Sequence, residues 1–152
     1  MTRSARAIQG LLLAALACGC QTHAATCNDD AAIAKSETAW KARHLSDYRF
    51  VWQQQCFCLV DAVQPIVVTV RHGQIVSAVD TKGAAVSDDI RADLLTIDAL
   101  YRRVDEMRCK ADEVRFTSSD DGVPQKIFID PSRQAADEEF EVNVSELTVL
   151  SP

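Results

Sequence analysis

The sequence predicts an α+β fold, a two-layer domain in which an antiparallel sheet of about six strands has two helices on one face. Two segments have helical character, and six shorter segments alternate apolar and polar residues as half-buried strands do. They follow in the order helix and three strands, which occurs twice. Two helices would cover the apolar face of such a sheet. The doubled order also suggests a tandem α-β-β-β repeat, although the two halves share no obvious residue identity.

Residues 28–80 predict the first helix and three strands. Residues 28–44 begin with one Asn and two Asp, which are good helix N-caps, and continue as an alanine-rich helix. From Tyr48 the period changes to two, because every second residue is aromatic up to Trp52. Residues 65–80 form two β-rich runs around His72-Gly73, which predicts a hairpin turn in which Gly73 takes a positive φ.

The second half begins with a connector at residues 81–95, whose signals are mixed. Residues 96–109 predict the clearest helix of the chain, since apolar residues recur on one stripe after Thr96, a plausible N-cap. Such a stripe is expected to pack in the core. Three strands are then predicted, the first two of which flank a turn at 120–122, at residues 112–119, 124–130 and 140–144.

The N-terminus predicts export. Arg3 and Arg6 precede the apolar segment 11–17, which is too short to span a bilayer, since a spanning helix needs about 20 residues. The sequence ALACGC after it resembles the lipobox of bacterial lipoproteins, in which a cysteine is acylated and becomes the new N-terminus. We therefore expect a signal peptide at 1–19, a lipidated tether at 20–27 and a single domain at 28–150.

Cys20 is the expected lipid-attachment residue, with Cys18 as the alternative. Lipidation of Cys20 leaves an even number of cysteines, which are Cys27, Cys56, Cys58 and Cys109. A second alternative is a soluble secreted protein cleaved near residues 22–24. In either case the folded domain lies outside the cytoplasm, where disulfides persist. The expected location is the bacterial cell envelope, facing the periplasm or the exterior.

The four remaining cysteines are expected to form disulfides. A helix over 28–44 is about 25 Å long, and a strand that doubles back from Tyr48 covers that length in about eight residues. This reasoning places Cys56 beside Cys27, with Cys58 as the near alternative. Such a link would stabilise the fold by about 2–4 kcal/mol. A link between Cys58 and Cys109 follows mainly from the even count.

Composition argues against several classes of function. The net charge of −6 and the pI of about 5.0, without a basic cluster, disfavour nucleic-acid binding. No G-x-S-x-G motif or EF-hand ligand series occurs. A structural metal site could combine the C-x-C pair with His44, His72 or Cys109, but the ligand spacing of structural zinc sites is missing. Copper(I) could use the C-x-C pair. We therefore expect no catalytic residue, no metal and no cofactor, hence not an enzyme.

Several short motifs together resemble a known family. They are Trp40, Tyr48 and the C-F-C of 56–58, and then the sequences PIVVTVRHG, TIDALY, DGVPQKIFID and DEEFEV. This set is similar to a group of uncharacterised bacterial exported proteins, the domain of unknown function numbered 6174, over residues 36–147. The resemblance implies export and a shared architecture, and it carries no assigned activity.

The expected function is that of an exported, lipid-anchored, non-catalytic envelope protein with a binding, assembly or maintenance role. Its expected partners are the membrane, through the N-terminal lipid, and another protein. The first alternative is a periplasmic thiol protein that binds copper or handles redox equivalents through Cys56 and Cys58. The second is an inhibitor of a secreted hydrolase, by analogy with other exported two-layer domains.

Overall fold

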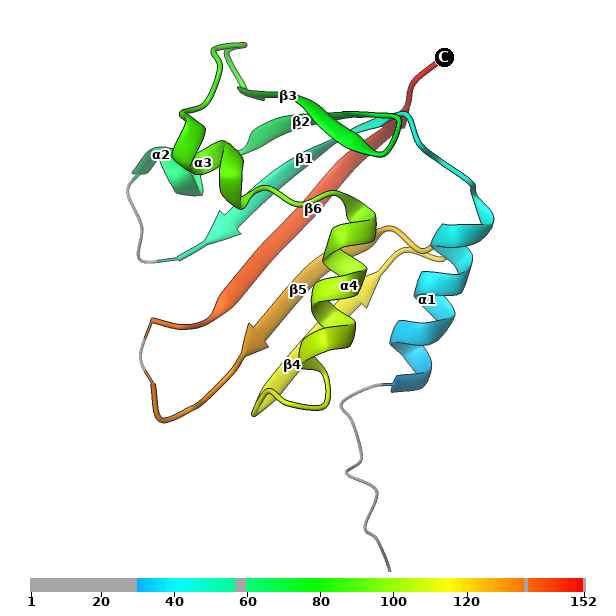
Figure 1. Cartoon of the computed structure of the whole chain (residues 1–152), viewed down its shortest axis with the longest axis vertical. Coiled ribbons are helices and arrows are strands. Elements are labelled where there is room, and N and C mark those ends of the chain that lie inside the picture. Colours follow the sequence, from blue (N-terminus) through cyan, green and yellow to red (C-terminus); the bar gives the residue numbers. More distant parts are fainter. Residues whose placement is uncertain (1–29, 57–59, 136, 152) are drawn as a thin grey trace, which may run out of the picture.

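The computed structural model describes residues 30–56, 60–135 and 137–151. They form one open antiparallel sheet of six strands together with four helices, which confirms the α+β class (Figure 1). The elements in chain order are α1 (Asp30–Ala42), β1 (Tyr48–Gln55), α2 (Val60–Val63), β2 (Ile66–Arg71), β3 (Gln74–Asp80), α3 (Asp88–Asp93), α4 (Ile97–Met107), β4 (Glu113–Ser118), β5 (Pro124–Asp130) and β6 (Phe140–Val149).

The sheet joins two three-stranded meanders through the first and last strands of the chain. Its order is β3-β2-β1-β6-β5-β4, and every neighbouring pair is antiparallel. The central pair, β1 with β6, brings Tyr48 opposite Val149 and Gln55 opposite Glu141. Because β6 lies in the middle of the sheet, the sheet is completed only by the last strand of the chain.

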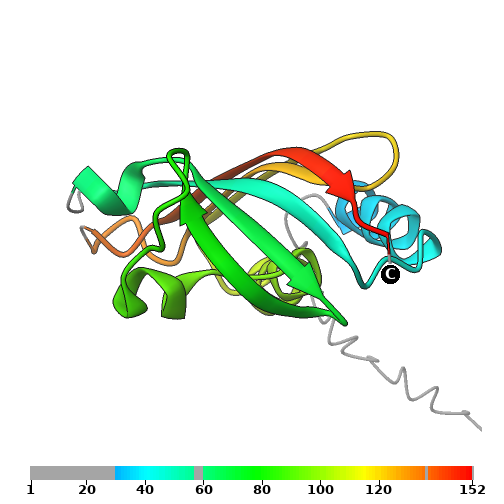
Figure 2. The same ribbon diagram turned by 90° about the horizontal axis from the view of Figure 1, so that it is seen from above.

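One face of the sheet carries the core. Every second residue is fully buried from Tyr48 to Trp52 in β1 and from Ile66 to Val70 in β2, as the alternation predicted. Helices α3 and α4 lie on one side of the sheet when it is viewed from above (Figure 2). The largest fully buried side chains belong to β1, β2, β5, α1 and α4, and include Trp52, Tyr48, Tyr101, Phe50, Ile33, Ile66, Ile97, Leu100, Ile127 and Ile129.

The helix predicted at 96–109 is confirmed as α4. Thr96 has an extended backbone, and its hydroxyl accepts a hydrogen bond from the backbone N–H of Ala99, which makes it the N-cap. The predicted apolar stripe is buried as far as Val104, and Met107 packs against the core from its edge. Sequence spacing therefore identified both the start and the buried face of this helix.

The predicted hairpin turn at His72-Gly73 is also confirmed. Both residues have positive φ values, 51° and 74°, and the flanking residues Arg71 and Gln74 pair. Positive φ at both central positions is the signature of a type I′ turn, whose twist matches that of antiparallel strands. The turn fixes the register of β2 and β3, and it also forms one wall of the cleft described below.

Three features differ from the sequence-based expectations. The short helices α2 and α3, of four and six residues, were not predicted, because a segment of that length shows little periodicity. The strand predicted to end at residue 144 continues to Val149. Glu146 has a φ of 53°, and the register with β1 shifts next to it, so a bulge interrupts the alternation there.

A buried polar cluster attaches α1 to α4 and to the β4–β5 turn. The Tyr101 hydroxyl donates to the backbone carbonyl of Gly122 at 2.8 Å and lies 2.5 Å from the Ser36 hydroxyl oxygen. The Trp40 indole N–H donates to the Asp98 carboxylate at 3.2 Å. Because the groups come from α1, α4 and the turn, the cluster fixes the position of all three.

The two tyrosines of the chain give a pH-dependent signal. Burial raises the pKa of Tyr48 and of Tyr101 from 10.0 to about 12. Since the folded pKa lies above the unfolded one, the phenols stabilise the fold fully below pH 10, and this stability is lost as the pH rises toward 12. We expect the folded protein to show little tyrosinate absorbance at pH 11 and the urea-unfolded chain to show nearly all of it. Tyrosinate formation near pH 10 in the folded protein would contradict the burial.

Candidate functional site

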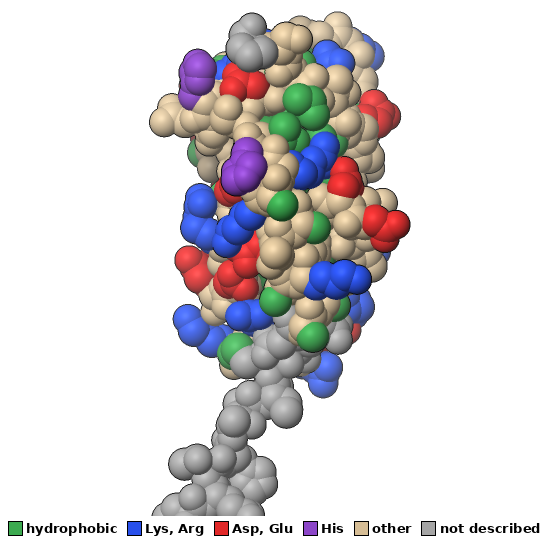
Figure 3. All heavy atoms as spheres, turned by 90° about the vertical axis from the view of Figure 1, so that its right-hand side faces the viewer, with side chains coloured by type: hydrophobic (Ala, Val, Ile, Leu, Met, Phe, Trp, Pro, Cys, Tyr) green, Lys and Arg blue, Asp and Glu red, His purple; other side chains and the backbone are tan. Residues whose placement is uncertain are grey.

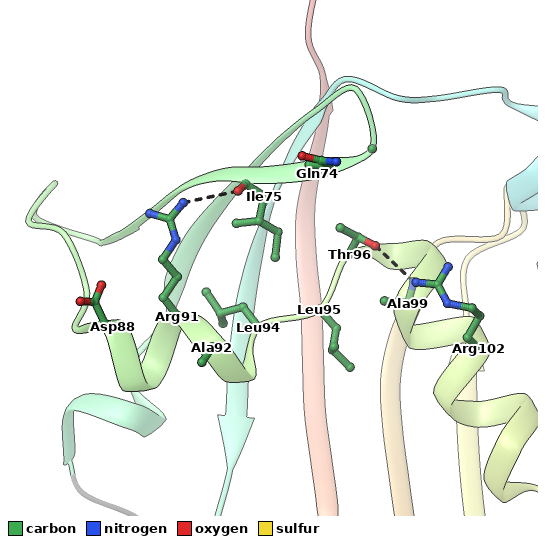
Figure 4. A pocket seen from close by; sticks show the side chains of 11 residues that line it. Gln74, Ile75, Asp88, Arg91, Ala92, Leu94, Leu95, Thr96, Ala99 and Arg102 are labelled. Carbon is green, nitrogen blue, oxygen red and sulfur yellow. Dashed lines mark hydrogen bonds between the residues drawn. The ribbon is translucent and has the colours of Figure 1, made fainter.

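A cleft of about 540 Å³ opens between the β2–β3 turn and the connection of α3 to α4. It has about twice the volume of the cavity beside Arg49 and Glu146 on the sheet, which measures about 270 Å³. Figure 4 shows apolar side chains along its floor and two arginines at its sides. We call it the arginine cleft, and its lining residues are Gly73, Gln74, Ile75, Asp88, Arg91, Ala92, Leu94, Leu95, Thr96, Ala99 and Arg102.

Local structure explains why these residues meet. Ser87 caps α3 by accepting from the Ile90 N–H, and α3 ends at Asp93 because Leu94 takes an extended conformation. Leu94 is buried and anchors the short link to the Thr96 cap of α4. The tight β2–β3 turn then brings the start of β3 over this link (Figure 4). The cleft is therefore formed by the β2–β3 turn on one side and by α3, the link and the start of α4 on the other.

Arg91 closes part of the exposed edge of β3. Its guanidinium donates to the backbone carbonyls of Ile75 and Val76 at 3.4 and 3.3 Å. Val76 is the extra residue where the register of β2 and β3 shifts. Bulges and charged side chains at edge strands block pairing with another chain. Arg91 therefore protects this edge, through two long and solvent-exposed hydrogen bonds.

Arg102, unlike Arg91, holds no other group of the described residues. Its side chain is exposed, and within residues 30–56, 60–135 and 137–151 it makes no hydrogen bond or ion pair. Asp88 is the carboxylate that lines the same cleft. An unpaired guanidinium next to apolar side chains is suited to an incoming carboxylate, because it offers a planar pair of donors.

The start of α4 offers few free N–H groups for binding an anion in the arginine cleft. The Ile97 N–H donates to the Tyr48 hydroxyl at 3.2 Å, and the Ala99 N–H donates to Thr96. The helix thus uses two of its first N–H groups internally. Recognition of an anion in the arginine cleft would therefore depend on the guanidinium groups.

The cysteines are only partly described. Cys56 and Cys109 are disulfide-bonded. Cys18, Cys20, Cys27 and Cys58 lie outside the described residues, as do the expected signal peptide and tether. The expected lipid attachment and the individual pairings therefore stay predictions.

The geometric premise of a Cys27–Cys56 link fails in the described residues. It required the strand after Tyr48 to double back along the first helix. The end of β1 instead pairs with the start of β6, on the side of the molecule that holds α2 (Figure 1).

Helix α1 lies antiparallel to α4. Ser36 contacts Tyr101 and, one turn later, Trp40 contacts Asp98, so the chain directions of the two helices are opposed. The first turn of α1 therefore lies beside the end of α4, and the end of β1 lies on the far side of the molecule (Figures 1 and 2). This places the start of α1 closer to Cys109 than to Cys56.

The remaining sequence candidates are not brought together. His44 and His72 are both exposed, and each lies in a loop with a positive φ. Across the described part of the chain, no group of three or more His, Cys, Asp or Glu could hold a metal ion. Among the same residues no helix is long and apolar enough to cross a membrane.

On the face that includes α1, cationic and anionic side chains are interspersed (Figure 3).

The arginine cleft was not predicted from the sequence. Its two arginines are eleven residues apart, and their segments were read as a mixed connector and as a core helix. The available signal was the position of Arg102 on α4, on the turn that follows the cap and off the buried stripe. Only the fold shows that the β2–β3 turn lies opposite it.

Comparisons with known proteins give one match. A family model described as "Family of unknown function (DUF6174)" matches residues 32–149. No curated protein and no solved structure matches the chain. The matched range includes nearly all the described elements and the whole arginine cleft.

Proposed function

The chain belongs to the family of unknown function DUF6174, and from that premise we propose that it is an exported, lipid-anchored envelope protein that binds a partner without catalysis. The observation that carries the binding role is the arginine cleft. It combines an apolar floor with an unpaired guanidinium, a combination common in binding sites. The proposed binding surface is formed by the domain itself, and the proposed lipid holds the domain at a membrane.

Export and anchoring are supported by the sequence. Arg3 and Arg6, the apolar segment 11–17 and the small residues before Cys20 form the expected order of a lipoprotein signal. The disulfide-bonded state of Cys56 and Cys109 fits an oxidising compartment. Export fits both the anchored binding protein and the periplasmic thiol alternative, whereas the disulfide-bonded state of Cys56 favours the binding protein over copper binding, which requires a thiolate at that residue.

The finer architecture is part of this proposal. We infer that α1, α3 and α4 form a second layer over the buried face of the sheet, leaving the other face open. The strand directions argue against a tandem repeat. In the order β3-β2-β1-β6-β5-β4, β1 and β4 run in opposite directions. To superpose β1-β2-β3 on β4-β5-β6, the first meander must be turned over, which would place its helix on the opposite face of the sheet from the helix of the second. Helices α1 and α4 instead contact each other.

Localisation tests the proposal most simply. The wild-type chain and a Cys20→Ser variant would be expressed in a diderm bacterium, and membranes would be separated from soluble fractions. We expect the wild type in the membrane fraction, extracted by detergent and not by high salt, and the variant retained as precursor or released. A wild type that is soluble in the periplasm would contradict anchoring and favour the secreted alternative.

The disulfide pattern gives a second test. Two residues separate Cys27 from Asp30, so chain length limits the Cα of Cys27 to within about 10 Å of the start of α1. Since that start lies beside the end of α4, we expect a link between Cys27 and Cys109, with Cys56 and Cys58 paired together. Non-reducing peptide mapping would identify the linked peptides. Recovery of Cys27 linked to Cys56 would overturn this pattern and restore the expectation from sequence.

A further inference from the structure

The arginine cleft is a local cationic site on an acidic protein. The whole chain has a net charge of −6, yet Arg91 and Arg102 oppose a single lining carboxylate, that of Asp88. Figure 4 shows the two guanidinium groups on either side of Ile75, Leu94 and Leu95. The order along the cleft is thus cation, apolar floor and cation. A partner with the order acid, apolar side chain and acid would be complementary.

The two arginines can both reach an incoming acid. Arg102 has no partner to give up within the described parts of the chain. Arg91 holds two backbone carbonyls at 3.3–3.4 Å, and both bonds lie in an exposed region, so water can replace it there at little cost. A carboxylate offers a charge-assisted, bidentate bond in exchange, which is stronger than a bond to a neutral carbonyl.

The shape of the cleft favours a peptide over an enclosed small molecule. Its rim is exposed at the β2–β3 turn, at α3 and at α4, because Gln74, Arg91 and Arg102 all face solvent. Sites for small molecules bury most of the ligand, whereas an open cleft suits a side chain presented by a larger partner. The bulge at Val76 interrupts the edge of β3, so recognition would use side chains and not strand addition.

We propose that the arginine cleft binds an acidic peptide segment of a partner protein, with an apolar residue between two carboxylates. The carboxylates would pair with Arg91 and Arg102, and the apolar side chain would pack against Ile75 and Leu95. This proposal rests on the binding role proposed above and specifies the chemistry of the partner.

The test uses two pools of short fluorescent peptides and the full chain purified from membranes in detergent. In the acidic pool, Asp or Glu stands on both sides of one apolar residue, which is Leu, Ile, Val or Phe. The neutral pool has Asn or Gln in place of the acids. Fluorescence anisotropy would measure binding. We expect the acidic pool to bind about tenfold more tightly than the neutral pool, because charge-assisted hydrogen bonds to a carboxylate are stronger than those to a neutral amide. Raised salt should reduce the difference.

Matched arginine variants locate the binding. Arg102→Ala should weaken binding of the acidic pool about tenfold, since it removes the unpaired cation. Arg49→Ala removes the same charge from an exposed position on β1, and it should leave binding within about twofold. Arg102→Lys should give an intermediate affinity, because lysine keeps the charge and loses the bidentate geometry. Circular dichroism of each variant would check that the fold is retained.

Each other outcome overturns the inference in a distinguishable way. Equal weakening by Arg49→Ala and Arg102→Ala would mean that only the total charge matters. Equal binding of both pools, abolished by Leu95→Asp, would mean that the cleft binds apolar groups, so that the proposed binding role survives without the acidic partner. If neither pool binds, the proposed acidic peptide ligand is wrong. The proposed lipid anchor would be unaffected, because membrane localisation tests it separately.

Discussion

Substituting alanine for Gly122 is expected to destabilise the fold by about 3 kcal/mol or more. Gly122 has a φ of 80°, and a Cβ added there would lie 2.3 Å from the backbone oxygen of Ser36 and 2.3 Å from the backbone nitrogen of Trp40. These atoms belong to the main chain of α1, so no side-chain rotation relieves the contact. The turn or the helix would have to move, and the Tyr101 bond to the Gly122 carbonyl would be lost with it.

Urea unfolding of the Gly122→Ala variant would measure this effect. The matched controls are Gly73→Ala and Gly83→Ala, which have similar positive φ values of 74° and 86° with no atom within 4 Å of the added Cβ. They carry only the backbone strain, about 1 kcal/mol each. The excess loss in Gly122→Ala reports the close packing of the β4–β5 turn on α1. Equal losses in all three variants would contradict that packing.

Replacing Tyr48 with alanine is expected to cost about 3–5 kcal/mol, the range for large aromatic residues in a core. The Tyr48 ring is fully buried, meets the Trp40 ring edge-on at a centroid distance of 5.3 Å and lies 6.0 Å from Phe50. Its hydroxyl accepts from the Ile97 N–H at the start of α4. One side chain at the first position of β1 thus connects α1, the sheet and α4.

Tyr48→Phe separates the two contributions. It keeps the ring packing and leaves the buried Ile97 N–H without its acceptor, for an expected loss of about 1 kcal/mol. Thermal or urea unfolding of both variants would give the comparison. A Tyr48→Phe loss as large as that of Tyr48→Ala would show that the hydroxyl, and not the ring packing, dominates.

Sequence patterns predicted correctly those features that depend on a single helix or turn. The Thr96 cap, the buried stripe of α4 and the His72-Gly73 turn each depend on local geometry, and each was predicted. Local signals failed at Glu146, where a bulge interrupts the alternation of β6, and at α2 and α3, which are too short to show a period.

The arginine cleft was missed for a different physical reason. Arg91 and Arg102 look like ordinary solvated charges in sequence, and nothing local distinguishes them from Arg49. Their meaning depends on the β2–β3 turn, which the fold brings over the α3–α4 link. The disulfide pairings stay predictions, but the geometric assumption behind Cys27–Cys56, that a strand returns along its preceding helix, does not hold, because α4 is the element that lies beside α1.

The intact mass of the protein extracted from membranes, measured without reduction and again after reduction and alkylation, tests the proposed envelope role most directly. We predict a chain that begins at an acylated Cys20 and whose four later cysteines become alkylated only after reduction. An unacylated chain whose cysteines react with the alkylating reagent before reduction would contradict both the anchor and the oxidised, non-catalytic domain.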